Sequence, residues 1–291
     1  MNSPHLPVLL DEVIAFLDMR QDGIYVDATI GLGGHSEHLL RHIGQGGKII
    51  GIDRDDAALG IAEKRLPDQR ITLRRGSFAD MESLLHAEGI SSVDGILFDL
   101  GVSMLQLKTP DRGFSFLSDE RLDMRMDSRQ KKSAWDVVNS YSEKELTRIL
   151  KEYGEERLSH KIAAAILRIR NKETIDTCSE LADIVERVYG GRGRIHPATR
   201  TFQALRIEVN RELQQLTDGL EAAQRLLKNG GRLCVIAYHS LEDRIAKRFI
   251  AESSKKGALK ILTKKPVTAS VEELRLNPSS RSAKLRAAEK I

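Results

Sequence analysis

Cysteine is scarce in this chain of 291 residues, which contains only Cys178 and Cys234. Two thiols are too few for a disulfide framework or for a zinc site built from four thiolates. Cys234 lies inside an apolar run, where a free cysteine behaves as a small buried hydrophobe. The sequence therefore favours a reducing, cytoplasmic setting.

Long apolar runs and aromatic residues are also rare. The apolar segment at residues 6–10 is followed at once by Asp11 and Glu12, so we expect neither a signal peptide nor a membrane span there. Aromatic residues make up 4% of the chain, with a single tryptophan, Trp135. This low content argues against an RNA-recognition sheet that stacks several bases. The length suits one large or two modest globular domains.

Basic charge is concentrated near the C-terminus. Residues 244–291 contain 13 Lys and Arg against 4 Asp and Glu, whereas residues 1–243 contain 33 against 38. Between residues 188 and 207 there are four arginines and no acid. Clustered basic charge favours a polyanionic partner, and nucleic acid is the first candidate. A solvated surface that keeps the protein soluble is the alternative.

Short apolar runs alternate with helix-like segments over residues 24–100. The runs at 24–28, 48–52, 71–74 and 93–98 are bounded by Gly, Asp or Ser, and segments such as 56–65 and 81–88 separate them. This alternation predicts a parallel sheet covered by helices on both faces. A further strand is expected at 231–238, after a helix that Asn229-Gly-Gly231 ends, and edge strands are expected at 260–262 and 284–288.

The alternation stops at Gly101 and does not resume for about a hundred residues. Ser142-Glu-Lys-Glu145 is a capping-box pattern before a helix, and helical apolar spacing recurs at 160–170, at 179–188 and from Thr199 onward. Residues 112–133 are expected to form a long polar loop. The sequence therefore predicts a discontinuous α/β domain at 1–108 and 215–291, with an inserted helical domain at 109–214.

Each of the first four expected strands ends in residues suited to a nucleoside-type cofactor. The first runs into Asp27-Ala-Thr-Ile-Gly31-Leu-Gly33-Gly34-His35-Ser36, a glycine-rich turn before a helix. The others end at Asp53, at Gly76-Ser-Phe78 and at Asp99. In open α/β sheets, ligands bind outside the carboxyl ends of the strands. Asp53 can hold the two hydroxyls of a ribose, and Phe78 can provide a platform for an adenine ring.

S-adenosylmethionine fits these residues better than a nicotinamide dinucleotide does. The dinucleotide fingerprint G-x-G-x-x-G needs a third glycine, which Gly31-Leu-Gly33-Gly34-His35-Ser36 lacks. The carboxylate of Asp27 suits the ammonium of a methionine group and would repel a pyrophosphate. A nicotinamide-dependent oxidoreductase therefore stays only as a remote alternative.

Asp99 is a candidate for the methyl-transfer chemistry itself. The amino nitrogen of a nucleobase is a poor nucleophile, and a carboxylate that accepts its N–H bond localises the lone pair and aims it at the methyl carbon. Alternatively, Asp99 caps the following turn or holds the methionine ammonium.

Two other sets of residues are poorer candidates. His35, His38 and His42 share one helical face, but a partly exposed helix face explains this spacing more simply than metal ligation, so no metal site is expected. His239-Ser240 with Glu242-Asp243 contains the residue types of a hydrolase triad. Adjacent residues on a strand point to opposite faces and cannot form one.

Several long motifs in this sequence closely resemble those of one known family, the bacterial 16S rRNA (cytosine-N4)-methyltransferases called RsmH or MraW. These motifs are distributed along almost the whole chain. They are His5-Leu-Pro-Val-Leu-Leu-Asp-Glu12, Asp27 to Ser36, Gly51-Ile-Asp-Arg-Asp55, Asp94-Gly-Ile-Leu-Phe-Asp-Leu-Gly-Val-Ser103, Arg112-Gly-Phe-Ser-Phe116, Leu122-Asp-Met-Arg-Met-Asp127, Tyr153-Gly-Glu-Glu-Arg157, His196-Pro-Ala-Thr-Arg-Thr-Phe-Gln-Ala-Leu-Arg206 and His239-Ser-Leu-Glu-Asp-Arg244.

The resemblance implies methylation of a cytidine amino group in the decoding region of 16S rRNA, with S-adenosylmethionine as cofactor. It implies a class I methyltransferase fold, which is a Rossmann-like, mainly parallel seven-stranded sheet, with an inserted helical domain. The cofactor contacts of the family carry over onto Gly33, Gly34, His35, Asp53, Phe78, Asp99 and Gln106. The 16S rRNA or the small ribosomal subunit is the implied partner, and a homodimer is one possibility for the assembly.

One departure from the family pattern affects the loop before Gln106. This chain has Met104-Leu105 where the family usually has Ser-Pro, so the loop lacks the fixed φ of proline. A ribosome-assembly factor that binds rRNA without catalysis is therefore the alternative function. The inserted domain, through Arg192, Arg194, Arg200 and Arg206, and the basic tail are expected to bind rRNA.

Overall fold

The computed structural model describes residues 6–117, 119–191 and 196–291 of the chain. The chain forms two compact units. The first, here called the sheet unit, contains Met1–Gly101 and Leu213–Ile291, and the second, here called the helical unit, contains Val102–Glu212. The helical unit thus interrupts the sheet unit along the chain.

The sheet unit is built on a single seven-stranded sheet in the order β3-β2-β1-β4-β5-β7-β6. Strands β1 to β5 pair in parallel, whereas β7 is antiparallel to both β5 and β6. The strands are β1 (Ile24–Asp27), β2 (Lys48–Asp53), β3 (Ile71–Arg75), β4 (Val93–Asp99), β5 (Leu227–Ala237), β6 (Leu259–Ile261) and β7 (Lys284–Lys290). The prediction of a Rossmann-like, mainly parallel seven-stranded sheet is confirmed.

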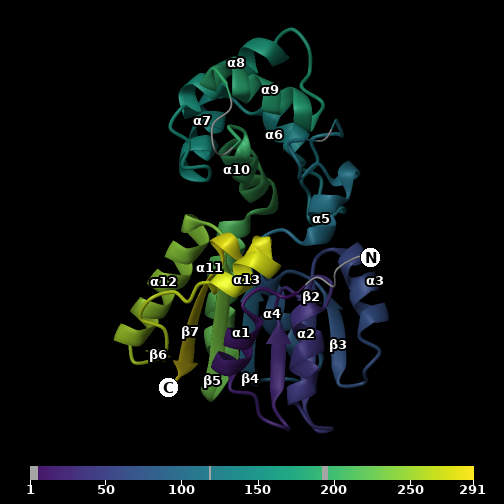
Figure 1. Cartoon of the computed structure of the whole chain (residues 1–291), viewed down its shortest axis with the longest axis vertical. Helices are drawn as coiled ribbons and strands as arrows, with labels where there is room; N and C mark the ends of the chain where they lie inside the picture. The colour runs from purple at the N-terminus through teal and green to yellow at the C-terminus, as the bar shows by residue number, and fades with distance from the viewer. Residues whose placement is uncertain (1–5, 118, 192–195) are drawn as a thin grey trace. The chain divides into compact units, whose positions relative to one another are not determined.

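Helices cover both faces of this sheet, with α1 and α2 in front of the strands in Figure 1. One face packs against α4, α11 and α12, and the other packs against α1, α2 and the end of α3. The helices of this unit are α1 (Leu10–Leu17), α2 (Gly34–Leu39), η1 (Leu40–His42), α3 (Asp56–Arg65), η2 (Phe78–Asp80), α4 (Met81–Ala87), α11 (Glu212–Leu226, the first residue of which belongs to the helical unit), α12 (Ser240–Lys255), α13 (Val271–Leu276) and η4 (Pro278–Ser282).

The central strands are apolar on both sides because both sides are buried. In β1, Tyr25 packs in the core of one face and Val26 in the core of the other, and each is 1% exposed. Leu97 and Ile96 of β4 divide between the faces in the same way. Side chains alternate along a strand, so a continuous apolar run is what a doubly covered parallel strand requires. Polar side chains are thereby restricted to the strand ends.

The junction between α11 and β5 differs from the prediction. We expected Asn229-Gly-Gly231 to end the helix and the strand to begin there, but α11 ends at Leu226 and β5 begins at Leu227. The register with β4 shifts in this stretch, since Val93 pairs with Leu227 and Gly95 with Arg232. The Asn-Gly-Gly segment therefore forms a bulge inside the strand, which Gly230 permits with a φ of +79°.

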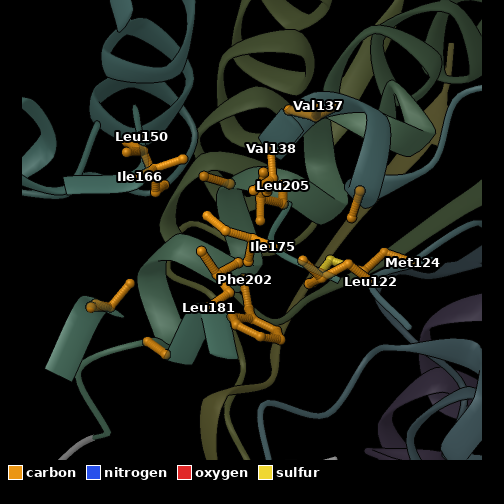
Figure 2. Close-up of a cluster of buried hydrophobic side chains, with 14 of the residues drawn as sticks. Leu122, Met124, Val137, Val138, Leu150, Ile166, Ile175, Leu181, Phe202 and Leu205 are labelled. Carbon is orange, nitrogen blue, oxygen red and sulfur yellow. The ribbon is translucent and has the colours of Figure 1, made fainter. Parts of the chain in front are cut away.

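The helical unit has its own apolar core, part of which Figure 2 shows. Phe202, Leu205 and Leu181 lie there beside residues of the other helices. The capping box predicted at Ser142 and Glu145 is present at the start of α7. The helices are α5 (Met104–Lys108), η3 (Pro110–Arg112), α6 (Ala134–Ser140), α7 (Glu143–Glu152), α8 (Ser159–Arg170), α9 (Cys178–Tyr189) and α10 (Thr199–Asn210).

Two expectations for this part of the chain need refinement. The helix expected from Thr199 onward is interrupted at Arg211, whose φ of +52° ends α10 before α11 begins. The loop at 112–133 is not only polar, because Leu122 and Met124 from this loop are buried in the core (Figure 2). The loop therefore contributes to the packing of the unit.

No helix among the described residues is long and apolar enough to cross a membrane.

Both cysteines, Cys178 and Cys234, are buried free thiols. Burial raises the pKa of each to about 12.

Replacing Leu205 by alanine should destabilise the helical unit. Leu205 is 1% exposed at the centre of the core, and such a truncation leaves a cavity that costs about 2–5 kcal/mol. Leu117→Ala is the control, because Leu117 is 75% exposed and its truncation should cost less than about 0.5 kcal/mol. Urea denaturation monitored by Trp135 fluorescence measures both. Equal effects of the two substitutions would contradict the core assignment.

Candidate functional site

The carboxyl ends of β1, β2, β4 and β5 meet at one edge of the sheet. Asp27 pairs in register with Gly51 on one side and with Leu97 on the other, and Asp99 pairs with Ile236. Parallel strands that end in register bring the residues after them together. This edge is where the structure gathers Asp27, Asp53 and Asp99.

The glycine-rich turn after β1 takes backbone conformations that suit glycine. Gly31 and Gly33 have φ values of +51° and +80°. A Cβ on Gly33 would lie 2.6 Å from Cδ1 of Leu66, so this position has no room for a side chain. Gly33 precedes α2, and no side chain caps that helix among the described residues. Gly33 and Gly34 therefore let the turn pack closely against the side chains of Leu66 and Pro7.

The carboxylate of Asp27 accepts hydrogen bonds from residues of the glycine-rich segment that follows β1. The hydroxyl of Ser36 donates to its Oδ2 at 2.7 Å, and the backbone N–H of Thr29 reaches its Oδ1 at 3.4 Å. The side chain is 2% exposed, and burial raises the pKa of Asp27 to about 6. Asp27 thus anchors the first turn of α2 to the end of β1.

Asp53 connects the turn to the second strand. Its Oδ2 accepts the backbone N–H of Gly31, and its Oδ1 accepts that of Asp55, both at 2.9 Å. Burial raises the pKa of Asp53, while these two amide donors lower it. Each carboxylate oxygen has a second lone pair, so the group can still accept from a diol.

His35 is buried and faces Asp99. Its Nε2 lies 3.0 Å from the carbonyl oxygen of Val8, which can only accept, so Nε2 carries the hydrogen. Burial lowers the pKa of His35, which favours the neutral ring. In that form Nδ1 has a lone pair, and it lies 3.5 Å from Oδ2 of Asp99. When Asp99 is ionised, two acceptors therefore face each other across this short distance.

Asp99 is the last residue of β4 and is held on three sides. Tyr238 donates its hydroxyl to Oδ1 at 2.8 Å, His35 lies beside Oδ2, and the backbone N–H of Asp99 donates to Oγ1 of Thr29 at 2.6 Å. Burial raises the pKa of Asp99 to about 7, the Tyr238 hydrogen bond lowers it, and the charge of Glu242 raises it. The carboxyl therefore titrates near neutral pH, as groups that act in proton or hydrogen-bond chemistry often do.

Phe78 lies after β3 and packs against two other elements of the sheet unit. Its ring meets the ring of Phe98 edge-on at 5.5 Å, and a Cβ on Gly219 of α11 would lie 2.8 Å from it. The guanidinium carbon of Arg54 is 5.8 Å from the ring centroid, and Arg54 also bonds Gln215. Phe78 is thus a fixed, partly buried aromatic side chain near the ends of β2 and β3.

Gln106, the seventh expected cofactor contact, belongs to the helical unit. It is buried and forms the capping box of α5, in which its Oε1 accepts the backbone N–H of Ser103 at 3.0 Å. The sheet unit alone brings together the other expected residues, namely Gly33, Gly34, His35, Asp53, Phe78 and Asp99.

The arginines expected to bind rRNA differ in their surroundings. Arg206 makes two hydrogen bonds of 2.9 Å with Glu212, and Arg200 donates to the carbonyl oxygen of Glu155 at 3.1 Å. Arg192 and Arg194 lie outside the described residues.

Two of the residues that resemble a hydrolase triad in type, His239 and Glu242, form a helix cap. His239 is the N-cap of α12, and its Nδ1 accepts the backbone N–H of Glu242, while the Glu242 carboxylate accepts the backbone N–H of His239. The two side chains satisfy the exposed amides of the first helical turn. In this structure His239 and Glu242 therefore serve as the N-terminal cap of α12.

Sequence reasoning missed Tyr238 as a site residue. It directly follows β5, so the rule that selected the residues after β1 to β4 would have selected it as well. The signal was present in the sequence, but strand β5 was used only as evidence for the fold.

The chain matches proteins of known family along its whole length. Residues 2–291 match the model of the MraW methylase family. A protein named ribosomal RNA small subunit methyltransferase H from Persephonella marina is 51% identical over 292 residues, which is 99% of each chain. Proteins of the same name from Caldicellulosiruptor saccharolyticus and Clostridioides difficile are 48% and 43% identical, over 99% and 100% of both chains. These matches confirm the family resemblance of the sequence motifs.

The raised pKa of Asp99 predicts how stability depends on pH. The folded state holds this proton up to about pH 7, whereas the unfolded chain releases it near pH 3.8, so stability falls as pH rises between these values. Asp99→Asn carries no titrating group and should lack this loss. With about a quarter of the side chain exposed, we expect the variant to gain about 1–2 kcal/mol over the wild type between pH 5 and 7.

Urea denaturation of both proteins at several pH values measures this difference, and the titrations of groups that do not interact with Asp99 cancel between them. Parallel stability curves from pH 5 to 8 would show that Asp99 has an ordinary pKa.

Proposed function

The chain belongs to the MraW methylase family, and from this premise we propose that it transfers the methyl group of S-adenosylmethionine to the N4 amino group of a cytidine in 16S rRNA. The observation that carries the proposal is the pair of acceptors at the end of β4. Oδ2 of Asp99 and Nδ1 of His35 lie 3.5 Å apart, so an amino group placed beside both atoms could donate one N–H to each. The N4 amino group of cytidine has two N–H groups, each of which can donate one hydrogen bond.

The strand ends of the sheet unit suit the parts of the cofactor. Asp53 accepts from the ribose hydroxyls with its remaining lone pairs, and Phe78 lies against the adenine ring. We assign the methionine part to the glycine-rich turn at Gly33 and Gly34, as the family resemblance implies. When bound, the cofactor supplies a methyl group on a positively charged sulfur, which an attacking nitrogen can take in line.

Asp99 supplies the activation that a cytidine amino group needs. By accepting one N–H of N4, the ionised carboxylate localises the nitrogen lone pair and orients it toward the methyl carbon. The positive charge that develops on N4 is stabilised by the same carboxylate. Because its pKa is raised to about 7, Asp99 can take up the released proton without a large free-energy difference.

The same acceptor pair suits a second donor, the ammonium group of the methionine part. In that role Asp99 contributes to cofactor affinity instead of to the chemical step. The two roles differ in what a substitution changes, because one lowers the turnover number and the other weakens binding.

We assign rRNA binding to the inserted helical domain and to the basic tail. The tail has exposed lysines such as Lys255, Lys256, Lys264 and Lys265, which suit phosphate contacts. Arg206 contributes less, because Glu212 already holds its guanidinium at two points. A cytoplasmic location and a homodimer stay predictions from the sequence.

Asp99→Asn should lower the turnover number for methylation of small-subunit rRNA by at least about 100-fold, because an amide accepts the N–H bond weakly. The dissociation constant for S-adenosylmethionine should rise less than about tenfold. Asp53→Ala is the contrasting variant, since loss of the ribose contact should raise that constant more than it lowers saturated turnover. Mass spectrometry of rRNA cytidine measures turnover, and calorimetric titration measures cofactor binding.

Near-normal turnover of Asp99→Asn at saturating cofactor would refute the role in the chemical step. A large loss of cofactor affinity with the turnover retained would assign Asp99 to the methionine ammonium instead. Methyl groups found on another atom or base would overturn the proposed substrate.

The affinity for small-subunit rRNA should fall steeply with salt, because phosphate contacts release counterions. Lys264→Glu should weaken binding and reduce the slope of log affinity against log salt by about 1. Lys64→Glu is the matched control, because Lys64 is also exposed but lies on α3, beside the edge strand β3 at the other edge of the sheet from β6 and β7. Equal effects of both substitutions in filter-binding titrations would show that only net charge matters.

A further inference from the structure

We propose that Tyr238 is a positioning residue for methyl transfer, which holds the Asp99 carboxylate so that Oδ2 faces the amino group of the substrate. The inference rests on the proposed role of Asp99 in the chemical step. It assigns a function to the segment Tyr238–Glu242, which the cofactor site described above does not use.

The sheet itself brings Tyr238 to Asp99. Strands β4 and β5 are neighbours, and Asp99 pairs with Ile236 two residues before Tyr238. The tyrosine hydroxyl donates to Oδ1 of Asp99 at 2.8 Å. With Oδ1 occupied, the carboxylate cannot rotate freely, and Oδ2 stays on the side of His35.

Tyr238 is fixed in turn at its ring and at its backbone. Gly101, whose φ of +104° suits glycine, lies against the ring, and a Cβ there would lie 3.3 Å from Cδ2 of the ring. Glu242, which is 3% exposed, accepts the backbone N–H of Tyr238 at 2.8 Å. Glu242 also closes the capping box of α12. The hydroxyl is therefore placed by the backbone of β5 and by the start of α12.

The hydroxyl has an electrostatic effect as well as a geometric one. Burial, Asp99 and Glu242 all raise the pKa of Tyr238, so the hydroxyl keeps its hydrogen and can only donate it to the carboxylate. Donation to the charged form lowers the pKa of Asp99 and opposes the effects of burial and of Glu242.

The other ionisable groups near this pair lie on several elements. Asp27 at the end of β1 interacts with Asp99, and Glu273 on α13 with His35 and Tyr238. These neighbours are mostly acidic, so Tyr238 supplies a neutral donor that favours an ionised Asp99. A phenylalanine at this position would fill the same space without that effect.

Tyr238→Phe tests the inference, since it removes the hydroxyl and keeps the ring. We expect the turnover number at pH 7 to fall about 10-fold and the acid limb of its pH profile to move up by about 0.5–1 pH unit. The Michaelis constants for S-adenosylmethionine and for small-subunit rRNA should change less than about twofold. Tyr141→Phe is the control, because Tyr141 also donates to a carboxylate, Oε1 of Glu208, at 2.6 Å.

Tyr141→Phe should leave the pH profile unchanged. A second measurement does not depend on activity: a carbon-13 NMR titration of the Asp99 carboxyl should show a higher pKa in Tyr238→Phe than in the wild type. An unshifted titration and acid limb would overturn the inference, as would a loss of turnover equal at every pH. If Asp99→Asn keeps near-normal turnover, the proposed function fails first, which is distinguishable from failure of Tyr238 alone.

Discussion

Burial of both sheet faces is the constraint on which the candidate site depends. A charged side chain within β1 or β4 would lose its hydration on either face, at a cost of several kcal/mol for an unpaired ion. Ionisable groups are therefore displaced to the strand ends, where a turn or the next helix can supply hydrogen bonds. Since parallel strands end together, this displacement collects the carboxylates of Asp27, Asp53 and Asp99 at one edge. The site follows from the packing of the sheet.

The three carboxylates are stabilised in three different ways. Asp53 receives two backbone amides, Asp27 mainly a serine hydroxyl, and Asp99 a tyrosine hydroxyl. Desolvation still raises the pKa of each, and the values for Asp27 and Asp99 come close to neutrality. Asp99 also faces a second acceptor on His35, which leaves this pair suited to a ligand that donates two hydrogens. Asp27, in contrast, makes its hydrogen bonds within the turn.

Much of the sheet unit could be predicted because its signals are local. Apolar runs and their bounding residues located the seven strands to within a few positions, although the Asn-Gly-Gly segment proved to be a bulge in β5 and not the end of a helix. Arg206 was expected from charge alone to be free for rRNA, but Glu212, six residues away, holds it at two points. Charge counts along a sequence do not show which cations are already paired. Tyr238 was missed because its importance depends on the neighbouring strand.

The sequence by itself determined the class of fold, the family and the side chains that stand at the strand ends, because hydrophobic periodicity and long motifs are written along the chain. Only the tertiary structure decided which of these side chains touch. The hydrogen bond between Tyr238 and Asp99 joins residues 139 positions apart, and the contact of His35 with Asp99 depends on α2 packing across β1. Such contacts, and the burial that shifts the pKa values of these groups, arise from strand order and register, which no local pattern encodes.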